Sequence, residues 1–238
     1  MRRKTPGNVD KDALIAGKIA VLEREDPERV ITALEEFVND RRKARLLQVI
    51  DQRVQSVQVI FESPHDPHNG AAVVRSCEAF GVQFIHVVET RERFLAAQSV
   101  ARGSEKWVDV ITHSVAARAI TAAIDANLEL VATHPDGELA PEDLANIPRL
   151  SLVLGNERDG IGEELRASCK RSVRVPMRGF VESLNVSVTA AILLSHACTQ
   201  RPGDLPENER RRLYARGLYF SLTHPDELLA RTPSKVAQ

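Results

Sequence analysis

Short apolar segments alternate along most of the chain with longer segments of helical periodicity. The apolar segments predict six buried strands, because short apolar runs bounded by turn residues are typical of strands covered on both faces. These strands are expected at 56–61, 83–88, 107–111, 128–133, 151–154 and 172–175. Helices are expected between them at 71–80, 115–126 and 163–169, followed by a long apolar helix that ends near Cys198. Strands separated by helices predict an α/β fold with a parallel sheet and helices on both faces.

Helical patterns also flank this region. The patterns at 11–25 and 28–39 are separated by Asp26 and Pro27, and the second can continue through 41–52. The segment after residue 200 begins with a Pro/Gly break and has a weak helical pattern at 207–218. We therefore expect a helical extension at 1–40, a main domain at 41–200 that begins with an arginine-rich helix, and a helical tail at 201–238.

The composition is that of an ordinary globular protein, with 43% hydrophobic and 27% charged residues in a chain of 238. No apolar run approaches the roughly 18 residues of a membrane span, and the N-terminus lacks a secretory apolar core. We therefore expect a cytoplasmic protein without a membrane segment. The three cysteines have no C-x-x-C spacing, which predicts neither a disulfide framework nor a zinc site. They are interpreted as small buried apolar side chains.

Basic residues are grouped, although the formal net charge is only −1. The groups are Arg41, Arg42, Lys43, Arg45 and Arg53 early in the chain, Lys170, Arg171, Arg174 and Arg178 around the last strand, and Arg210, Arg211, Arg212 and Arg216 late in the chain. Such groups can bind phosphates, but most runs of charge are solvated surfaces. Charge alone leaves nucleic-acid binding open.

Three turns rich in glycine, proline or asparagine follow predicted strands, at 64–70, 155–162 and 176–185. Ligands of parallel sheets bind at the carboxyl ends of strands, so these turns are candidates for one site. In the third turn, Pro176 and Gly179 break the chain before the polar residues Ser183 and Asn185 open the long apolar helix. Such a turn can hold an anion or a nucleoside edge, or it can be a buried capped connection.

Common nucleotide and hydrolase motifs are absent from the sequence. The segment 155–162 is not G-x-G-x-x-G, and no G-K-[ST] or G-x-S-x-G occurs. The sequence therefore argues against a Rossmann dinucleotide site, a P-loop and an α/β-hydrolase nucleophile. No H-E-x-x-H motif or acidic metal cluster is present either, and we expect no metal.

Three segments, in this order, resemble the motifs of the SpoU branch of SPOUT RNA methyltransferases. They read DPHNGAAVVRSCEAFG at 66–81, LVLGNERDGI at 152–161 and VPMRGFVESLNVSVTAAILL at 175–194. Within this branch the chain is most similar to TrmH-type tRNA guanosine 2'-O-methyltransferases. The reasons are the arginine-rich helix directly before the first strand, the KWV element at 106–108 and the LVATH stretch at 130–134.

The resemblance implies a deep C-terminal trefoil knot, a homodimer and S-adenosyl-L-methionine as the cofactor. It implies methylation of a ribose 2'-hydroxyl in tRNA, with the D-loop guanosine at tRNA position 18 as the target. Two alternatives stay open: 2'-O-methylation of ribosomal RNA, and a catalytically silent RNA-binding knot protein.

The resemblance also assigns residues to roles. Cofactor contacts are expected from Thr133, Gly155, Asn156, Val175, Pro176, Met177 and Leu184. Catalytic residues are expected to be Arg75, Asn69, Glu157, Ser183 and Asn185. RNA phosphates are expected to contact Arg41, Arg42, Arg45 and Arg53.

Arg75 occupies the family's catalytic arginine position. Because a guanidinium stays protonated, we interpret Arg75 as a clamp for a phosphate and the developing alkoxide, with the family's arginine-as-base proposal as the alternative. Asn69 is expected to orient Arg75 or the ribose, or simply to cap its helix. Glu157 is expected to fix Asn69 or the arginine network, or to act as a carboxylate at a helix N-terminus.

Two residues depart from the family pattern. Glu182 stands where relatives commonly carry glutamine, which places a carboxylate near an expected phosphate. Arg178 stands where an apolar or small residue is usual, and its positive charge can offset that carboxylate.

Overall fold

The computed structural model describes residues 11–64, 66–89, 103–156 and 158–232. The chain forms two compact units. The α/β unit comprises Gln52–Asp204, and the helical unit comprises Met1–Asp51 together with Leu205–Gln238. The helical unit includes the arginine-rich helix, which the sequence predicts at the start of a main domain at 41–200, together with both terminal segments.

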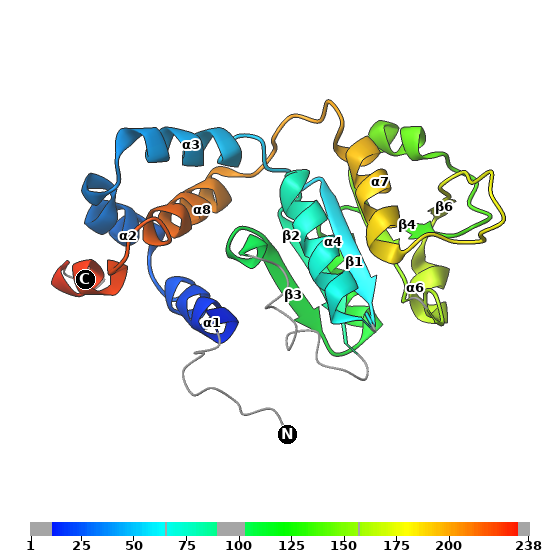
Figure 1. Ribbon diagram of the computed structural model, residues 1–238, viewed down its shortest axis with the longest axis horizontal. Coiled ribbons are helices and arrows are strands. Elements are labelled where there is room, and N and C mark those ends of the chain that lie inside the picture. The colour runs from blue at the N-terminus through cyan, green and yellow to red at the C-terminus, as the bar shows by residue number, and fades with distance from the viewer. Residues whose placement is uncertain (1–10, 65, 90–102, 157, 233–238) are drawn as a thin grey trace, which may run out of the picture. The chain divides into compact units, whose positions relative to one another are not determined.

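Six parallel strands form the sheet of the α/β unit, in the order β3-β2-β1-β5-β4-β6 (Figure 1). The strands are β1 (Val57–Glu62), β2 (Phe84–Val88), β3 (Asp109–His113), β4 (Glu129–Thr133), β5 (Leu150–Leu154) and β6 (Arg171–Val173). Each lies within two residues of a predicted strand, and the prediction of a parallel sheet is confirmed.

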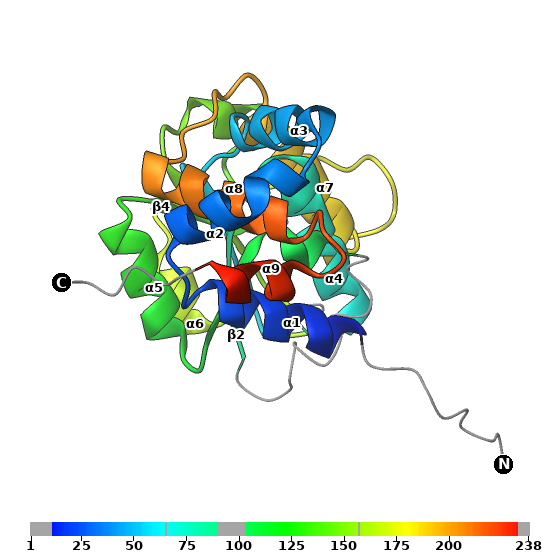
Figure 2. The ribbon, with the colours of Figure 1, turned by 90° about the vertical axis from the view of Figure 1, so that its left-hand side faces the viewer.

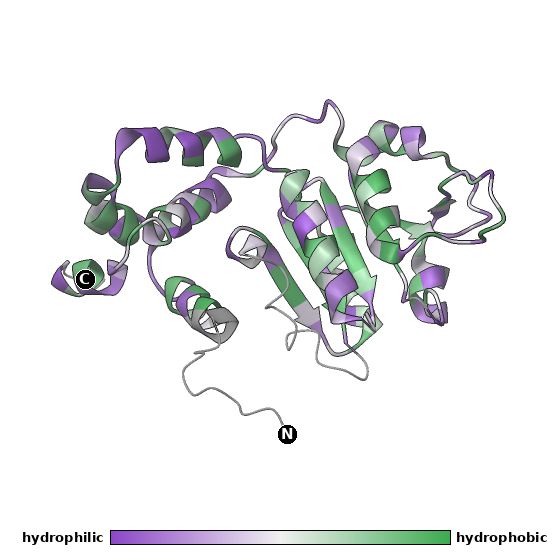
Figure 3. Cartoon of the chain, viewed as in Figure 1, coloured by the Kyte–Doolittle hydropathy of each residue, from purple (hydrophilic) through white to green (hydrophobic). Residues whose placement is uncertain are grey.

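Helices cover both faces of this sheet. The helices α4 (Pro67–Ala79) and α7 (Val186–Cys198) pack over an apolar cluster that includes Val59 and Phe61. On the other face, α5 (Ala116–Asp125) and α6 (Glu163–Ser168) pack over Ile60 and Val153. Consecutive residues of β1 therefore enter different cores, as expected of a strand buried on both sides. In Figure 3, α7 and most of β1 are accordingly green, the colour of hydrophobic residues.

Two short 3-10 helices lie in the described part of the α/β unit. The helix η3 (Ser104–Lys106) precedes β3, whereas the expected polar loop or short helix at 91–103 lies almost wholly outside the described residues. The helix η4 (Pro141–Asn146) occupies a segment that the sequence predicts as a loop. Arg201 donates to the carbonyl oxygens of Ile147 at 2.8 Å and Pro148 at 2.6 Å, which satisfies the backbone after η4.

The helical unit contains α1 (Lys11–Leu22), α2 (Pro27–Leu34), η1 (Glu35–Phe37), α3 (Asp40–Ile50), α8 (Glu207–Tyr219) and α9 (Pro225–Arg231) (Figure 2). The second helical pattern does not continue unbroken from 28 through 52, a possibility that the sequence leaves open. The chain is extended at Asn39, whose side chain accepts a hydrogen bond from the Arg42 N–H and thereby starts α3 as a new helix. Leu46 of α3 packs closely on Gly217 of α8, where a Cβ atom would lie 2.7 Å from the leucine.

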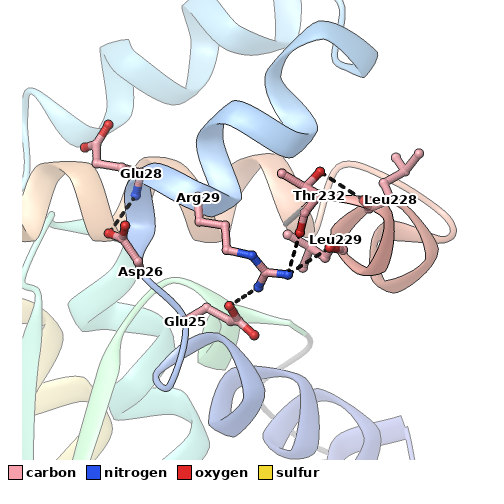
Figure 4. A network of polar contacts seen from close by, with 7 residues as sticks. All are labelled: Glu25, Asp26, Glu28, Arg29, Leu228, Leu229 and Thr232. Carbon is pink, nitrogen blue, oxygen red and sulfur yellow. Dashed lines mark hydrogen bonds and ion pairs between the residues drawn. The ribbon is translucent and has the colours of Figure 1, made fainter. Parts of the chain in front are cut away.

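Two arginines of the late cluster link α8 to other parts of the helical unit, and a third pairs within α8. Arg210 pairs with Asp51, Arg211 with Glu28 and Arg212 with Glu209. A similar network surrounds Arg29 of α2, which pairs with Glu25 and donates to the carbonyl oxygens of Leu229 at 2.9 Å and Thr232 at 3.0 Å (Figure 4). Arg29 thus satisfies carbonyls at the end of α9.

Candidate active site

The three candidate turns meet at one edge of the sheet. They follow β1, β5 and β6, and the strand order β1-β5-β4-β6 places the carboxyl ends of these strands next to one another. Only β4 lies between β5 and β6, and it ends at Thr133. A parallel sheet therefore brings segments that are distant in sequence to a common site.

A cavity of about 420 Å³ opens at this edge. Such a volume is within the range of ordinary ligand pockets. Of the seven residues predicted to contact a cofactor, six line the cavity: Thr133, Gly155, Asn156, Val175, Met177 and Leu184. Pro176 does not line it. The remaining lining residues are His134, Pro135, Gly160, Val173, Glu182, Ser183, Asn185, Val186 and Thr189.

Glycine residues allow the 155–162 turn to close on itself. A Cβ atom at Gly155 would lie 2.2 Å from the carbonyl carbon of Gly160, and Gly160 itself has a φ of +70°. Asn156 fixes the turn, because its Oδ1 accepts from the N–H groups of Arg158 at 2.8 Å and Asp159 at 2.7 Å. The turn is also tied to β1, since the Gly162 N–H donates to the Glu62 carboxylate at 2.6 Å.

Asn185 joins the third turn to the first. Its Oδ1 accepts from the N–H of Ser187 at 2.8 Å, which makes Asn185 the N-cap of α7. Because this oxygen is an acceptor, the amide nitrogen is directed elsewhere, and it donates to Oδ1 of Asn69 at 2.9 Å. Asn69 lies in the first turn of α4, after the N-cap Asp66. The predicted catalytic residues Asn69 and Asn185 are therefore in direct contact.

Arg75 lies further along α4, and its side chain is exposed. It does not line the cavity. A separation of six residues corresponds to a rotation of roughly 240° around a helix, so Asn69 and Arg75 do not share a face of α4. Asn69 instead faces Asn185. Ser183 is at the cavity, whereas Glu157 is outside the described residues.

The four arginines predicted to contact RNA differ in their surroundings. Arg41 and Arg45 are exposed on α3, and Arg42 is half-buried with its Nε donating to Ser221 Oγ at 2.9 Å. Arg53 is 3% exposed and pairs with Glu78 at 3.3 Å inside the α/β unit. The prediction that Arg53 contacts an RNA phosphate is therefore wrong, because its guanidinium is buried in an ion pair. The sequence spacing gives no sign of this burial.

The cysteines are unsuited to nucleophilic chemistry. Cys77 is fully buried, and burial raises the pKa of its thiol well above the usual range. Burial also raises the pKa values of Cys169 and Cys198 to about 11, so all three thiols stay protonated at neutral pH. The prediction of a small buried side chain is confirmed for Cys77, while the other two are partly exposed.

Two features are absent from the described residues. No group of three or more His, Cys, Asp or Glu side chains there is arranged to hold a metal ion. Within the same ranges, no helix is both long enough and apolar enough to cross a membrane.

Residues 56–195 match the model of the SpoU rRNA Methylase family, and the chain belongs to this family. It is 32% identical over 192 residues to the tRNA (guanosine(18)-2'-O)-methyltransferase of Escherichia coli, a match that covers 76% of this chain and 84% of that enzyme. The enzyme of the same name from Thermus thermophilus is 31% identical over 163 residues, covering 68% of this chain and 84% of the relative.

A solved structure agrees with this assignment. The TrmH/SpoU tRNA modifying enzyme of A. aeolicus superimposes with a TM-score of 0.66 at 25% sequence identity. The match covers 77% of this chain and 98% of the other. The resemblance seen in the three sequence motifs is thereby confirmed at the level of the family.

Proposed function

We propose that this protein transfers a methyl group from S-adenosyl-L-methionine to a ribose 2'-hydroxyl of tRNA, at the D-loop guanosine of tRNA position 18. The observation that carries the proposal is the cavity lined by six of the seven predicted cofactor residues, with the Asn69–Asn185 hydrogen bond at its edge. The names of the relatives from E. coli and T. thermophilus support the tRNA substrate.

The lining of the cavity fits the cofactor. Val175, Leu184 and Val186 offer apolar surface for a purine ring, and the turn at 155–162 offers backbone groups at close range because its glycines lack side chains. Thr133 has its hydroxyl bound to the Val153 carbonyl at 3.1 Å, which keeps the end of β4 in place against β5. Apolar walls with a few polar groups are typical of cofactor sites.

S-adenosyl-L-methionine supplies a methyl group bound to a sulfonium sulfur, which is already a good leaving group. The protein must hold the ribose hydroxyl in line with that methyl group and assist removal of the hydroxyl proton. Asn185 and Asn69 fix the first turns of α7 and α4 relative to each other and so hold the edge of the cavity.

Arg75 provides an exposed guanidinium on α4. A guanidinium remains protonated, so Arg75 holds an RNA phosphate and stabilises the negative charge that develops on the 2'-oxygen. Ser183 lines the cavity and holds the turn or an RNA phosphate there. The proton leaves to the phosphate or to water.

The proposal extends to a trefoil knot, a homodimer and a cytoplasmic location. The knot is supported by the path after β4, where Leu139 pairs with β6 through hydrogen bonds to Ser172 and Arg174 of 3.0 and 3.1 Å. A Cβ atom at Gly137 would lie 2.5 Å from the Val173 carbonyl carbon, so this crossing is tight. The homodimer is supported by Phe180 and Val181, two strongly exposed apolar side chains on the third turn.

The proposed activity is tested by methylation of a tRNA transcript with labelled cofactor. We expect Arg75→Ala to lower kcat by a factor of about 100 or more, since it removes a group that acts in the transition state. Arg118→Ala, an exposed arginine on α5, is the matched control and should keep full activity. Full activity in Arg75→Ala would contradict the role of this residue.

The substrate is tested by mapping the methylated nucleotide. We expect one 2'-O-methyl group at the guanosine of position 18 in tRNA and none in a ribosomal RNA transcript. Methylation of ribosomal RNA alone would support the alternative that the family description names. Methylation of neither RNA, together with intact RNA binding, would support a catalytically silent knot protein.

A further inference from the structure

Glu182 is the only Asp or Glu among the fifteen residues that line the cavity, all of which are described. Its side chain is exposed at the cavity edge. Within the described part of the chain it forms no ion pair and no hydrogen bond of its side chain, whereas other carboxylates near this edge have partners. Glu62, for example, accepts from Gly162, and Glu138 accepts from Ser172. A carboxylate in this position is available to whatever occupies the cavity.

Methyl transfer changes the charge inside the cavity. The carbon–sulfur bond breaks, its electron pair stays on sulfur, the carbon bonds to the ribose oxygen, and the hydroxyl proton leaves to a phosphate or water. The sulfonium of the methyl donor thus becomes a neutral thioether in the product, S-adenosylhomocysteine. A fixed negative charge nearby stabilises the positively charged sulfonium more than the neutral thioether.

We propose that Glu182 makes the cavity discriminate between the methyl donor and its demethylated product by charge. This inference rests on the proposed function, because it concerns the same cavity. The carboxylate binds the positively charged donor more tightly than the neutral product, which reduces product inhibition. The Glu182 carboxylate repels RNA phosphates. Arg178, which is exposed on the same turn, offsets this repulsion with its positive charge.

The size of the effect follows from the exposure of Glu182. Exposed charge pairs contribute little, equivalent to about two- to fivefold in affinity, because water and salt screen them. The preference for donor over product should therefore be modest at physiological salt and should decrease as salt is added. A purely steric contact of Glu182 would show no such salt dependence.

The test is isothermal titration calorimetry of the full-length protein with three probes. These are S-adenosylmethionine, S-adenosylhomocysteine and sinefungin, an analogue that carries an ammonium group where the donor carries the methylated sulfur. We expect Glu182→Gln to weaken the two cationic probes about two- to fivefold and to leave the neutral product unchanged. Glu182→Asp keeps the charge and should keep the preference. Glu164→Gln removes an exposed carboxylate that does not line the cavity, and it should have no effect.

Each other outcome has a defined meaning. An equal loss for all three probes would show that Glu182 contacts a part that they share, such as the amino-acid ammonium group or the ribose, which overturns the inference. Unchanged affinities in Glu182→Gln would overturn it as well, while the proposed function would stand because the wild-type protein still binds the donor. If the wild-type protein binds none of the probes, the proposed function itself fails, and the inference fails with it.

Discussion

At the scale of single residues, Asn185 serves two elements at once. Its amide oxygen caps α7 through Ser187, and its amide nitrogen holds Asn69 at the start of α4. A hydroxyl or carboxylate side chain would cap the helix equally well, so the cap alone does not require an asparagine. The hydrogen bond to Asn69 explains why the residue is an asparagine. An amide group places an acceptor and a donor on separate atoms, so it can cap α7 and hold Asn69 at the same time.

This dual role predicts different results for two substitutions. Asn185→Ala removes both interactions, so we expect it to lower the free energy of unfolding by about 1 kcal/mol and to lower methylation strongly. Asn185→Ser keeps the cap but cannot reach Asn69, so it should retain stability and lose activity. Urea unfolding followed by Trp107, the single tryptophan of the chain and part of the α/β unit, measures stability. A serine variant with full activity would show that the contact with Asn69 is dispensable.

The limits of sequence reasoning are also visible at individual residues. The positions of Thr133, Gly155 and Leu184 at the cavity were predictable, because the family resemblance places them at strand ends or in the turns that follow strands. Arg53 was predicted incorrectly, because burial depends on Glu78, a residue 25 positions away that only the fold brings near. Position in a motif predicts proximity to the site, but it does not predict the partners of a long charged side chain.

At the scale of elements, strands were predicted better than helix boundaries. The four central strands β1, β2, β5 and β4 are mostly apolar and almost wholly buried, so their composition predicts burial on both faces. The edge strands β3 and β6 are only partly buried. The hydrophobic period leaves the break between α2 and α3 open because it continues across the break, and the cap at Asn39 marks the new start. The helix α9 was missed because it is short and begins at Pro225, where its polar composition resembles a loop.

A polar network crosses three strands inside this apolar sheet. The Gln58 amide donates to the Gln55 carbonyl, which leaves its oxygen to accept from Nε2 of His86 at 3.0 Å. Nδ1 of His86 must then accept from Nε2 of His113 at 2.8 Å. Burial, with a further effect of the neighbouring His113, lowers the pKa of His86 to about 4. Both imidazoles are therefore neutral in the native protein.

This network predicts a specific pH dependence of stability. In the unfolded chain His86 titrates near its ordinary pKa of 6.5, whereas the folded pKa is about 4. Between these values the unfolded state binds more protons than the folded state. The contribution of neutral His86 to the free energy of unfolding is therefore fully present above about pH 6.5. It decreases by up to about 3 kcal/mol as the pH falls toward 4. The variant His86→Gln should weaken the dependence of the free energy of unfolding on pH. His68 is an exposed histidine of α4, and the variant His68→Gln should leave this dependence unchanged. Parallel curves for wild type and His86→Gln in urea unfolding between pH 5 and 7.5 would contradict the assignment.

At the scale of the whole molecule, binding to a polyanion must come from a local surface, because the formal net charge is −1. The late arginine cluster does not provide this surface, since Arg210, Arg211 and Arg212 are paired with carboxylates of the helical unit. Arg41 and Arg45 are exposed on α3, whose surface is largely hydrophilic in Figure 3. Of the four arginines predicted to contact RNA, these two are the exposed ones.

This distinction predicts how tRNA binding depends on salt. Each phosphate that a basic side chain neutralises releases a counterion and steepens the decrease of affinity with salt by roughly 0.7–0.9 in a logarithmic plot. The double variant Arg41→Gln/Arg45→Gln should therefore bind tRNA more weakly and reduce the slope by about 1 to 2. Arg118→Gln, an exposed arginine of α5, should leave both quantities unchanged. Filter binding from low to high salt measures the slope, and an unchanged slope in the double variant would remove α3 from the RNA-binding surface. Weaker binding at an unchanged slope would mean that the substitutions disturbed the helical unit without removing a phosphate contact.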